Sequence, residues 1–208
     1  MSYSIEIIRK SEQKTSSWSG GTTTQLAIYP KDASYNNRNF KWRISSAKVE
    51  TTESIFTPLP SFWRLIMIID GQMHLEHKDH HSISLNPFEQ DSFSGEWTTH
   101  SYGKVTDFNL MMAKGCKGNL EAIEILEEEN IEIVDIHDLY TNEFTISTEG
   151  FYCINHHVSI VIDQKEEILL QKGNLLLIHM KSPSQKLPLK ILNEIQKTIH
   201  IIRVSVVY

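Results

Sequence analysis

The feature that most constrains the fold is a long series of short apolar segments separated by turn residues. Between residues 40 and 113 these segments read FKWRISSAKV, FWRLIMIIDGQMHLEH, HSISLNPFEQDSFSGEW and VTDFNLMMA. Apolar and polar side chains alternate in several of them, which is the period of a strand with one buried face. Stretches with the 3.6-residue period of a helix are nearly absent, so the sequence predicts an all-β fold.

Three segments carry more local predictions. Asp70-Gly71 is a strong signal for a tight hairpin between two strands. Residues 116–135 fit either a short helix or a pair of charged strands, because the acidic run at 127–129 makes a solvated turn in both. Residues 136–143, IHDLYTNE, are the best remaining place for a helical turn.

The second half of the chain repeats the strand pattern of the first half in outline. Short strands with turns every ~8–12 residues predict a sandwich or barrel, and two such sets predict two jelly-roll-like barrels in tandem. We expect a first barrel over residues 1–115 and a second over residues 116–208, joined as one compact unit with exchanged strands. The C-terminal segment IHIIRVSVVY, residues 199–208, fits either a core strand or the edge of a homodimer.

Composition excludes several classes of partner. A formal net charge of -6 over 208 residues argues against a nucleic-acid-binding protein, which needs a basic face. No apolar run approaches the ~18 residues of a membrane span, and the N-terminus MSYSIEIIRK lacks the pattern of a signal peptide. Cys116 and Cys153 are the two cysteines, and without a C-x-x-C pattern they are expected to be reduced thiols that could pair only if the fold brought them together. The sequence therefore predicts a cytoplasmic protein.

Two arginines stand inside predicted strands. Arg43 lies within KWRISSA, and Arg64 opens the apolar run RLIMII. A guanidinium buried in a strand is costly unless it meets an acid or an anionic ligand. Asp107 is an available internal acid, so a structural ion pair is one interpretation. With Asn109 two residues further along the same strand face, the set also resembles the lining of a small polar cavity.

The glycine pair in WSGGTTTQLAIYP raises the question of a phosphate loop. Neither the P-loop pattern nor the dinucleotide pattern is present, and no helix follows to hold an anion at its N-terminus. Gly20 and Gly21 therefore predict a turn before a strand. Thr22 and Thr24 share one face of that strand and offer hydroxyls to a ligand.

The ten histidines do not form the usual metal-binding pattern of a jelly roll. Two histidines two apart on a strand point the same way, whereas His74 and His77 are three apart and face opposite sides. His80 and His81 fall in a predicted turn, where side chains are usually solvated. We therefore expect no metal and no cofactor. No nucleophilic triad is evident, so no catalytic residue is assigned.

The order of these motifs resembles the landmarks of the HutD/Ves family. The similarity is dense over residues ~15–115 and thin afterwards. Members of this family are linked to histidine-utilisation operons or are described as stress-induced. The resemblance implies a cupin-like fold of two barrels (a bicupin) that lacks the usual metal-ligand motif, and a small carboxylate-bearing metabolite as ligand.

The resemblance also implies a ligand site in the first barrel. Arg43 and Arg64 would hold a carboxylate, with Asn109, Ser45 and Thr23 completing the hydrogen bonds. Trp18 would wall the mouth of the site. The implied ligand-binding residues are Trp18, Thr23, Arg43, Ser45, Arg64, Asp107 and Asn109.

Two positions depart from the family pattern. Family members often have an acid where Gln25 stands, and Trp63 replaces the acid expected before Arg64. If that acid normally neutralises Arg64, this arginine is here either freer for a ligand or repositioned.

The sequence thus predicts a metal-independent bicupin that binds a small anionic metabolite and regulates histidine utilisation or related metabolism. The second barrel is expected to be structural. One alternative is a metal-dependent cupin enzyme, an isomerase or hydrolase that uses His74, Glu76 or His100. Another is a protein-interaction module. The residues favour binding over catalysis.

Overall fold

The computed structural model describes residues 3–127, 130–133, 144, 146–181 and 187–208. These residues form nineteen strands and one short 3-10 turn, η1 (Lys10–Glu12), which confirms the predicted all-β class. No helix in the described part of the chain is long and apolar enough to cross a membrane. The helical turn expected at residues 136–143 falls outside the described residues.

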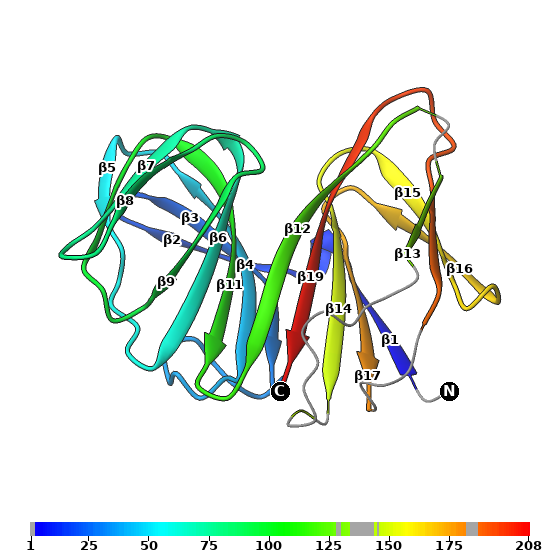
Figure 1. Ribbon diagram of the computed structural model, residues 1–208, viewed down its shortest axis with the longest axis horizontal. Helices are drawn as coiled ribbons and strands as arrows, with labels where there is room; N and C mark the ends of the chain where they lie inside the picture. Colours follow the sequence, from blue (N-terminus) through cyan, green and yellow to red (C-terminus); the bar gives the residue numbers. More distant parts are fainter. Residues whose placement is uncertain (1–2, 128–129, 134–143, 145, 182–186) are drawn as a thin grey trace. The chain divides into compact units, whose positions relative to one another are not determined.

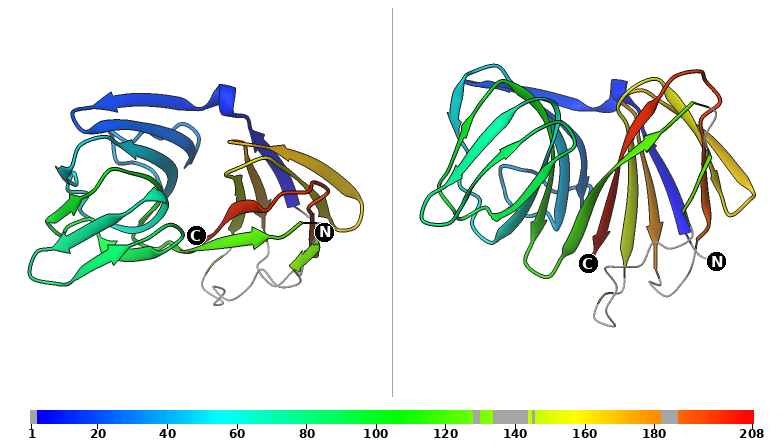
Figure 2. Two further views of the ribbon diagram at one scale, coloured as in Figure 1. Left: turned by 90° about the horizontal axis from the view of Figure 1, so that it is seen from above. Right: turned by 45° about the horizontal axis from the view of Figure 1, so that its top comes forward.

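The chain divides into two compact units, drawn with their strand labels in Figure 1. The first barrel consists of residues 13–116, and the second of residues 1–12 together with 117–208. This division differs from the predicted boundary at the N-terminus, because β1 (Tyr3–Ile8) pairs with β17 (Leu175–Met180). Figure 2 shows β1, in dark blue, among the strands of the second barrel. Ile5 and Ile7 pack there against the core, which accounts for the placement of this strand.

The first barrel contains two sheets. The six-stranded sheet has the order β2 (Lys14–Trp18), β3 (Gly21–Tyr29), β4 (Trp42–Val49), β11 (Val105–Ala113), β6 (Phe62–Gly71), β9 (Gln90–Ser94). The four-stranded sheet has the order β5 (Glu53–Ile55), β10 (Thr99–Tyr102), β7 (Met73–His77), β8 (Ser82–Leu85).

The second barrel also contains two sheets. The five-stranded sheet has the order β1, β17, β14 (Ser147–Cys153), β19 (Ile199–Val207), β12 (Lys117–Ile125). The four-stranded sheet has the order β13 (Asn130–Ile133), β18 (Leu189–Leu192), β15 (His157–Ile162), β16 (Glu166–Gln171).

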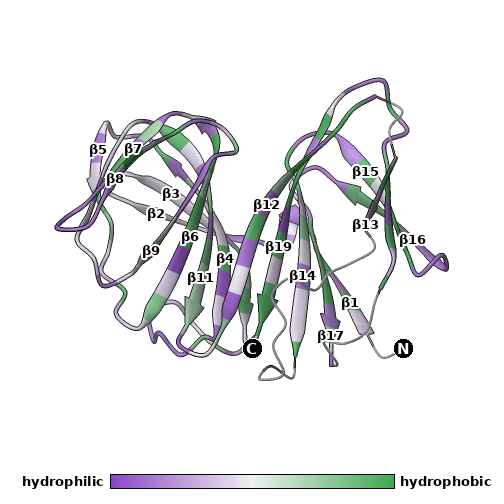
Figure 3. Cartoon of the chain, viewed as in Figure 1, coloured by the Kyte–Doolittle hydropathy of each residue, from purple (hydrophilic) through white to green (hydrophobic). Residues whose placement is uncertain are grey.

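Each barrel has its own apolar core. In the first barrel, one cluster lies between the two sheets and includes Ile66, Ile68, Met73, Leu75 and Phe93. A central strand such as β11 is buried along most of its length, including its polar residues Asp107 and Asn109. In contrast, β12 alternates hydrophilic and hydrophobic residues along its length, which Figure 3 shows as bands of colour.

The prediction of a hairpin at Asp70-Gly71 is wrong, because the two strands that flank it do not pair with each other. Asp70 and Gly71 are the last two residues of β6 and pair with β11, and only Gln72 separates them from β7. β6 pairs with β11 and β9, whereas β7 pairs with β10 and β8. The chain therefore passes from one sheet to the other at this corner. Gly71 has a φ of 85°, and an added Cβ would meet the carbonyl oxygen of Lys104, so a glycine suits the corner as well as it suits a hairpin.

The two ambiguous segments are both resolved as strands. Of residues 116–135, the described parts form β12 and β13, which pair with β19 and β18 and not with each other. The C-terminal strand β19 lies between β14 and β12, so both of its edges are hydrogen-bonded. It is a core strand and offers no edge to a second copy of the chain. Cys116 and Cys153 are free thiols.

Candidate functional site

The first barrel contains a cavity of about 300 Å³. Its lining comes from the six-stranded sheet, from the loop before β4 and from the segment around β5. Polar groups converge on one side, and Tyr35, Ile55 and Phe56 supply apolar and aromatic surface. All seven residues that the resemblance implies as ligand-binding line this cavity: Trp18, Thr23, Arg43, Ser45, Arg64, Asp107 and Asn109.

Strand register explains how residues so far apart in sequence meet. Arg43 on β4 is opposite Met111 on β11, and Arg64 on β6 is opposite the same methionine from the other side. Ser45 is opposite Asn109 one step further along. Because residues two apart on a strand share a face, these positions form adjacent rows on the cavity side of three neighbouring strands.

Arg43 is buried, but its partners are neutral. Its Nε donates to Oε1 of Gln25 at 3.0 Å, and its Nη1 donates to the Ser45 hydroxyl at 3.0 Å. The guanidinium also lies over the ring of Tyr35, with 4.7 Å from Cζ to the ring centroid. Burial lowers the pKa of Arg43 from its ordinary value. Its positive charge is therefore solvated by dipoles and a π face, and not by an acid.

Arg64 is buried to the same extent as Arg43, and its hydrogen bonds are less complete. Its Nη2 donates to Oδ1 of Asn109 at 3.2 Å, while its Nε has no hydrogen-bond partner. Phe56 and Phe93 lie beneath the guanidinium, at 4.6 and 5.3 Å from Cζ. Burial lowers the pKa of Arg64 to about 10, so the side chain stays charged at neutral pH. A buried donor without a partner is costly to the folded state.

Asp107 is the acidic residue that lines the cavity, but its hydrogen bonds are made to groups other than the two arginines. Its Oδ1 accepts from Nδ2 of Asn109 at 2.6 Å and from the backbone N–H of Ala47 at 3.2 Å. Burial raises its pKa to about 6, against the opposing effects of the Ala47 amide and of Arg64. Within the described residues, neither arginine forms an ion pair with a carboxylate. The structural ion pair left open by the sequence is therefore not formed.

The predicted turn before a strand is present: Ser19 and Gly20 form the turn between β2 and β3, and Gly21 is the first residue of β3. This hairpin borders the cavity. A Cβ on Gly20 would strike the indole of Trp18, and one on Gly21 would strike the carbonyl oxygen of Lys48. The edge strand of the sheet is β2, not the strand that follows the glycines. Thr23 lines the cavity, whereas Thr24 bonds to Thr15. The face that the sequence assigned to Thr22 and Thr24 is thus the one turned away from the site.

The two departures from the family pattern have different consequences. Gln25 contacts Arg43 directly, so an amide stands where an acid would neutralise the guanidinium. Trp63 is 44% exposed and donates its indole N–H to Ser92 at 2.6 Å. It lies on the opposite face of β6 from buried Arg64. An acid at position 63 would therefore not reach Arg64 along this strand.

The histidines considered for an enzyme lie on an outer strand face. His74 contacts Ser84 at 2.9 Å and Glu76 at 3.7 Å, and His100 is opposite Glu76 in the sheet. In the described part of the chain, one group of side chains has a spacing compatible with a metal ion, and it consists of His77, His81 and Asp91. The pattern of two histidines two apart does not include this group. The sequence feature that could have indicated it is a pair of histidines four apart across a turn, His77 and His81.

The second barrel also has a buried polar group. Glu149 accepts from Arg203 Nε at 3.1 Å and from the Ser205 hydroxyl at 2.8 Å. Burial raises the pKa of Glu149 to about 7, although Arg203 opposes the shift. Unlike Arg64, Arg203 has carboxylate partners, since Glu121 lies 3.2 Å from its Nη1. This cluster is an internally neutralised ion-pair network.

The chain is similar to known proteins both in sequence and in fold. A model of the HutD family matches residues 10–196. Protein Ves from Escherichia fergusonii is 29% identical over 106 residues, which cover 48% of this chain and 53% of Ves. The matched segment spans about half the length of that curated relative.

Solved structures resemble the chain over nearly its whole length. A conserved protein of unknown function from Pseudomonas aeruginosa PAO1 has a TM-score of 0.78 and 18% identity, with 98% of each chain covered. HutD from Pseudomonas fluorescens SBW25 has a TM-score of 0.67 and 16% identity, again with 98% of each chain covered. Oxalate decarboxylase from Lactobacillus farciminis has a TM-score of 0.66 and 7% identity, covering 95% of this chain and 85% of that one.

Oxalate decarboxylase and bacterial pirin YhhW from Escherichia coli are cupin proteins, so the predicted cupin-like fold is confirmed. Sequence identities this low establish the fold alone. The family assignment rests instead on the sequence model, which covers most of the chain from Lys10 onward. This chain therefore belongs to the HutD family.

Proposed function

We propose that the protein binds a small carboxylate metabolite in the first-barrel cavity, with Arg43 and Arg64 as the principal ligands and without a metal in the cavity. The observation that carries the proposal is the pair of buried guanidiniums that line one cavity and form no ion pair with a carboxylate in the described part of the chain. Keeping two cations out of water in this way costs free energy unless an anion accompanies them.

A carboxylate suits this arrangement for geometric reasons. Its two oxygens match the planar donor fork of a guanidinium, and such hydrogen bonds are shorter and stronger than neutral ones. Arg64 has an unused Nε donor, and Asn109 already orients its Nη2. The Ser45 hydroxyl and Thr23 complete the polar side of the cavity.

The size and apolar surface of the cavity restrict the ligand further. A volume of about 300 Å³ lies at the lower end of ligand-binding pockets, which favours a small metabolite. Tyr35, Phe56 and Trp18 offer aromatic surface to the remainder of the ligand. A short carboxylic acid with an unsaturated or amide-like body fits both properties.

Membership of the HutD family supports a regulatory role for such binding in histidine utilisation or related metabolism. In this proposal the protein acts in the cytoplasm, senses a carboxylate intermediate and adjusts flux through the pathway. The free state of both cysteines is in keeping with a reducing compartment.

The experiment is a thermal-shift screen followed by calorimetry. Probes are urocanate, formiminoglutamate, formylglutamate and, as the smallest carboxylate, formate, because HutD from Pseudomonas fluorescens was solved in a formate condition. A ligand that binds the folded state raises the unfolding temperature. We expect Arg43→Gln and Arg64→Gln each to weaken the affinity by roughly 10- to 100-fold, since a charge-assisted hydrogen bond contributes about 1.5–3 kcal/mol.

Arg9→Gln is the matched control, because Arg9 is an exposed arginine of the second barrel. It should leave the affinity unchanged, and so should removal of metals with EDTA. The proposal fails if none of the probes binds, or if both cavity variants bind as tightly as the unaltered protein.

A further inference from the structure

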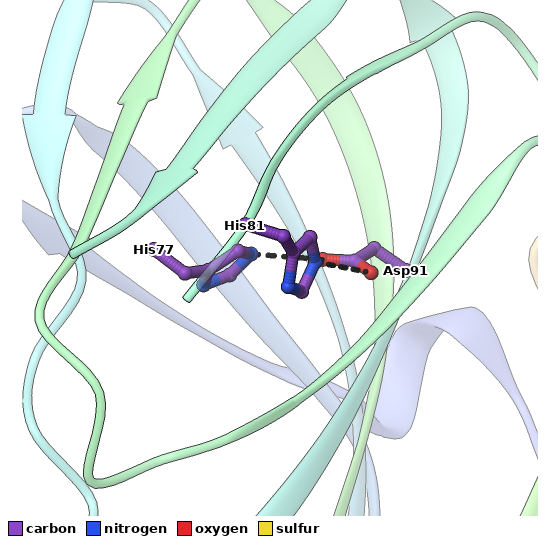
Figure 4. Close-up of side chains that lie close together, drawn as sticks. All are labelled: His77, His81 and Asp91. Atoms are coloured by element: carbon purple, nitrogen blue, oxygen red, sulfur yellow. Dashed lines mark hydrogen bonds and ion pairs between the residues drawn. The ribbon is translucent and has the colours of Figure 1, made fainter. Parts of the chain in front are cut away.

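A compact group of metal-ligand side chains lies in the first barrel outside the lining of the arginine cavity. His77 is the last residue of β7, His81 follows the turn after it, and Asp91 lies in β9. Figure 4 shows both imidazoles directed at the Asp91 carboxylate. Nε2 of His77 is 2.8 Å from Oδ2, and Nε2 of His81 is 3.1 Å from Oδ1.

The turn that carries the two histidines is held by several contacts. The His77 N–H donates to the carbonyl of His81 at 2.8 Å, and the His80 N–H donates to the carbonyl of His77 at 3.0 Å. Asp79 has a φ of 63°, which closes the turn. The ring of His80 stacks on Trp97 with 3.7 Å between centroids. The backbone thus places His77 and His81 on the same side of the turn.

We propose that His77, His81 and Asp91 form a binding site for a divalent transition-metal cation of the zinc class. Two imidazole nitrogens and one carboxylate oxygen, within 4.8 Å of one another, are a ligand set that such cations use when a further position stays open. This inference goes beyond the carboxylate-binding function, and neither requires the other.

The distances from one Asp91 oxygen to the two imidazole nitrogens are close to those of a tetrahedral site. Zinc ligands at about 2.0–2.1 Å from the metal lie roughly 3.3 Å from each other. Oδ2 of Asp91 lies 2.8 Å from Nε2 of His77 and 3.2 Å from Nε2 of His81, so these two separations need to open by only a few tenths of an ångström. The two Nε2 atoms would then exchange a hydrogen bond to the carboxylate for a bond to the cation.

The surroundings prepare His77 for this role. Its Nδ1 is 2.8 Å from the Thr99 hydroxyl, the kind of outer contact that orients a metal-bound imidazole. Its side chain is 0% exposed and packs against Phe93 with 4.4 Å between ring centroids. Burial lowers the pKa of His77, against the opposing effect of Asp91, and so favours the neutral ring that donates a lone pair.

His81 supplies the open side of the site. Its side chain is 40% exposed, whereas that of Asp91 is 10% exposed. Solvent therefore reaches the group from the side of His81, where a water molecule would complete the coordination. Phe93 also lies beneath Arg64, so one ring contacts both this site and the arginine cavity.

The test is zinc binding by the full chain after EDTA treatment and dialysis. We expect calorimetry to give one Zn²⁺ per chain with micromolar or tighter affinity. Co²⁺ should give the visible absorption of a four-coordinate site with nitrogen and oxygen ligands. His81→Gln and Asp91→Asn should each weaken Zn²⁺ binding at least ~10-fold, as should Thr99→Val through the orientation of His77.

His74→Gln is the matched control, because His74 lies on the outer face of the same strand. It should keep the full affinity. Circular dichroism and thermal unfolding in EDTA would establish that each variant is folded. Absence of Zn²⁺ binding at micromolar concentrations overturns the proposal. Binding that persists in both His81→Gln and Asp91→Asn also overturns it, since the metal would then lie elsewhere.

Discussion

At the scale of single residues, the charge of the arginine cavity depends on the groups that touch each guanidinium. Gln25 gives Arg43 an amide oxygen, and Asn109 gives Arg64 another. Neither partner carries a negative charge, so neither one neutralises the guanidinium that it contacts. A single substitution that places a carboxylate beside a guanidinium would neutralise it from within the protein.

Gln25→Glu is therefore expected to compete with the ligand. A glutamate at this position would accept from Nε of Arg43, where Gln25 does so now at 3.0 Å. We expect the affinity for a carboxylate ligand to fall about tenfold, which corresponds to 1.4 kcal/mol, measured by calorimetry. Trp63→Glu is the control, because that side chain is exposed on the opposite face of β6 and should leave the affinity unchanged. Equal affinities of all three proteins would contradict the geometry.

Asp107 predicts a pH dependence of stability. Burial raises its pKa to about 6, above the ordinary value of 3.8, so the folded protein binds this proton more tightly than the unfolded chain. The contribution of Asp107 to the free energy of unfolding falls as pH rises from about 4 to about 6, and the loss is complete above that range. The stability advantage of Asp107→Asn over the unaltered protein should therefore grow by about 2 kcal/mol between pH 4.5 and pH 7.5.

Urea unfolding at the two pH values measures this difference. Asparagine keeps the oxygen that accepts from Ala47 and Asn109, so the variant tests charge more than packing. Asp70→Asn, at an exposed position, should show no comparable change between the two pH values. A difference for Asp107→Asn that is constant with pH would show that Asp107 has an ordinary pKa.

At the scale of elements, the β2–β3 hairpin positions the mouth of the cavity through its two glycines. Gly20 leaves space for the indole of Trp18, and Gly21 allows the close approach of β4. The pairing of Ser16 with Thr23 continues the hairpin along the cavity, where both residues line the wall. The same pair of glycines therefore serves two separate requirements, one for a side chain and one for the backbone.

Alanine substitutions should separate these requirements. Gly20→Ala displaces a partly exposed indole, so we expect altered tryptophan fluorescence and weaker ligand binding with little loss of stability. Gly21→Ala meets backbone at Lys48 and has a φ of 152°, so it should cost about 1–3 kcal/mol in the free energy of unfolding. Thermal unfolding and fluorescence measure both. Equal losses of stability in the two variants would argue against this assignment.

Elements were predictable from sequence to the extent that their contacts are local. The alternation in VTDFNLMMA defines a strand wherever its neighbours lie, and the faces of Asp107 and Asn109 follow from their spacing. The pairing of β6 with β11 and β9 was not predictable, because Asp70-Gly71 signals a turn without specifying which sheet receives the next strand. The local signal for a turn is the same in a hairpin and at a barrel corner.

At the scale of the whole molecule, each barrel has its own apolar core and its own cluster of buried polar residues. The N-terminal strand β1 completes the sheet of the second barrel, although the first barrel follows it in sequence. The second barrel pairs Arg203 with Glu121 and Glu149, whereas in the first barrel Arg43 and Arg64 form no ion pair with a described carboxylate. This contrast in charge compensation supports a ligand site in the first barrel and a structural role for the second.

The amino-acid sequence by itself determined the all-β class, the faces of the strands and the presence of two arginines that require an anion. These follow from side-chain period and from the cost of burying a charge, both of which are local properties. Only the tertiary structure decided that those arginines meet at one cavity without an ion pair to a described carboxylate, and that His77 and His81 converge on Asp91. Such convergence depends on strand register and on the choice of sheet, which arise from packing among segments distant in sequence.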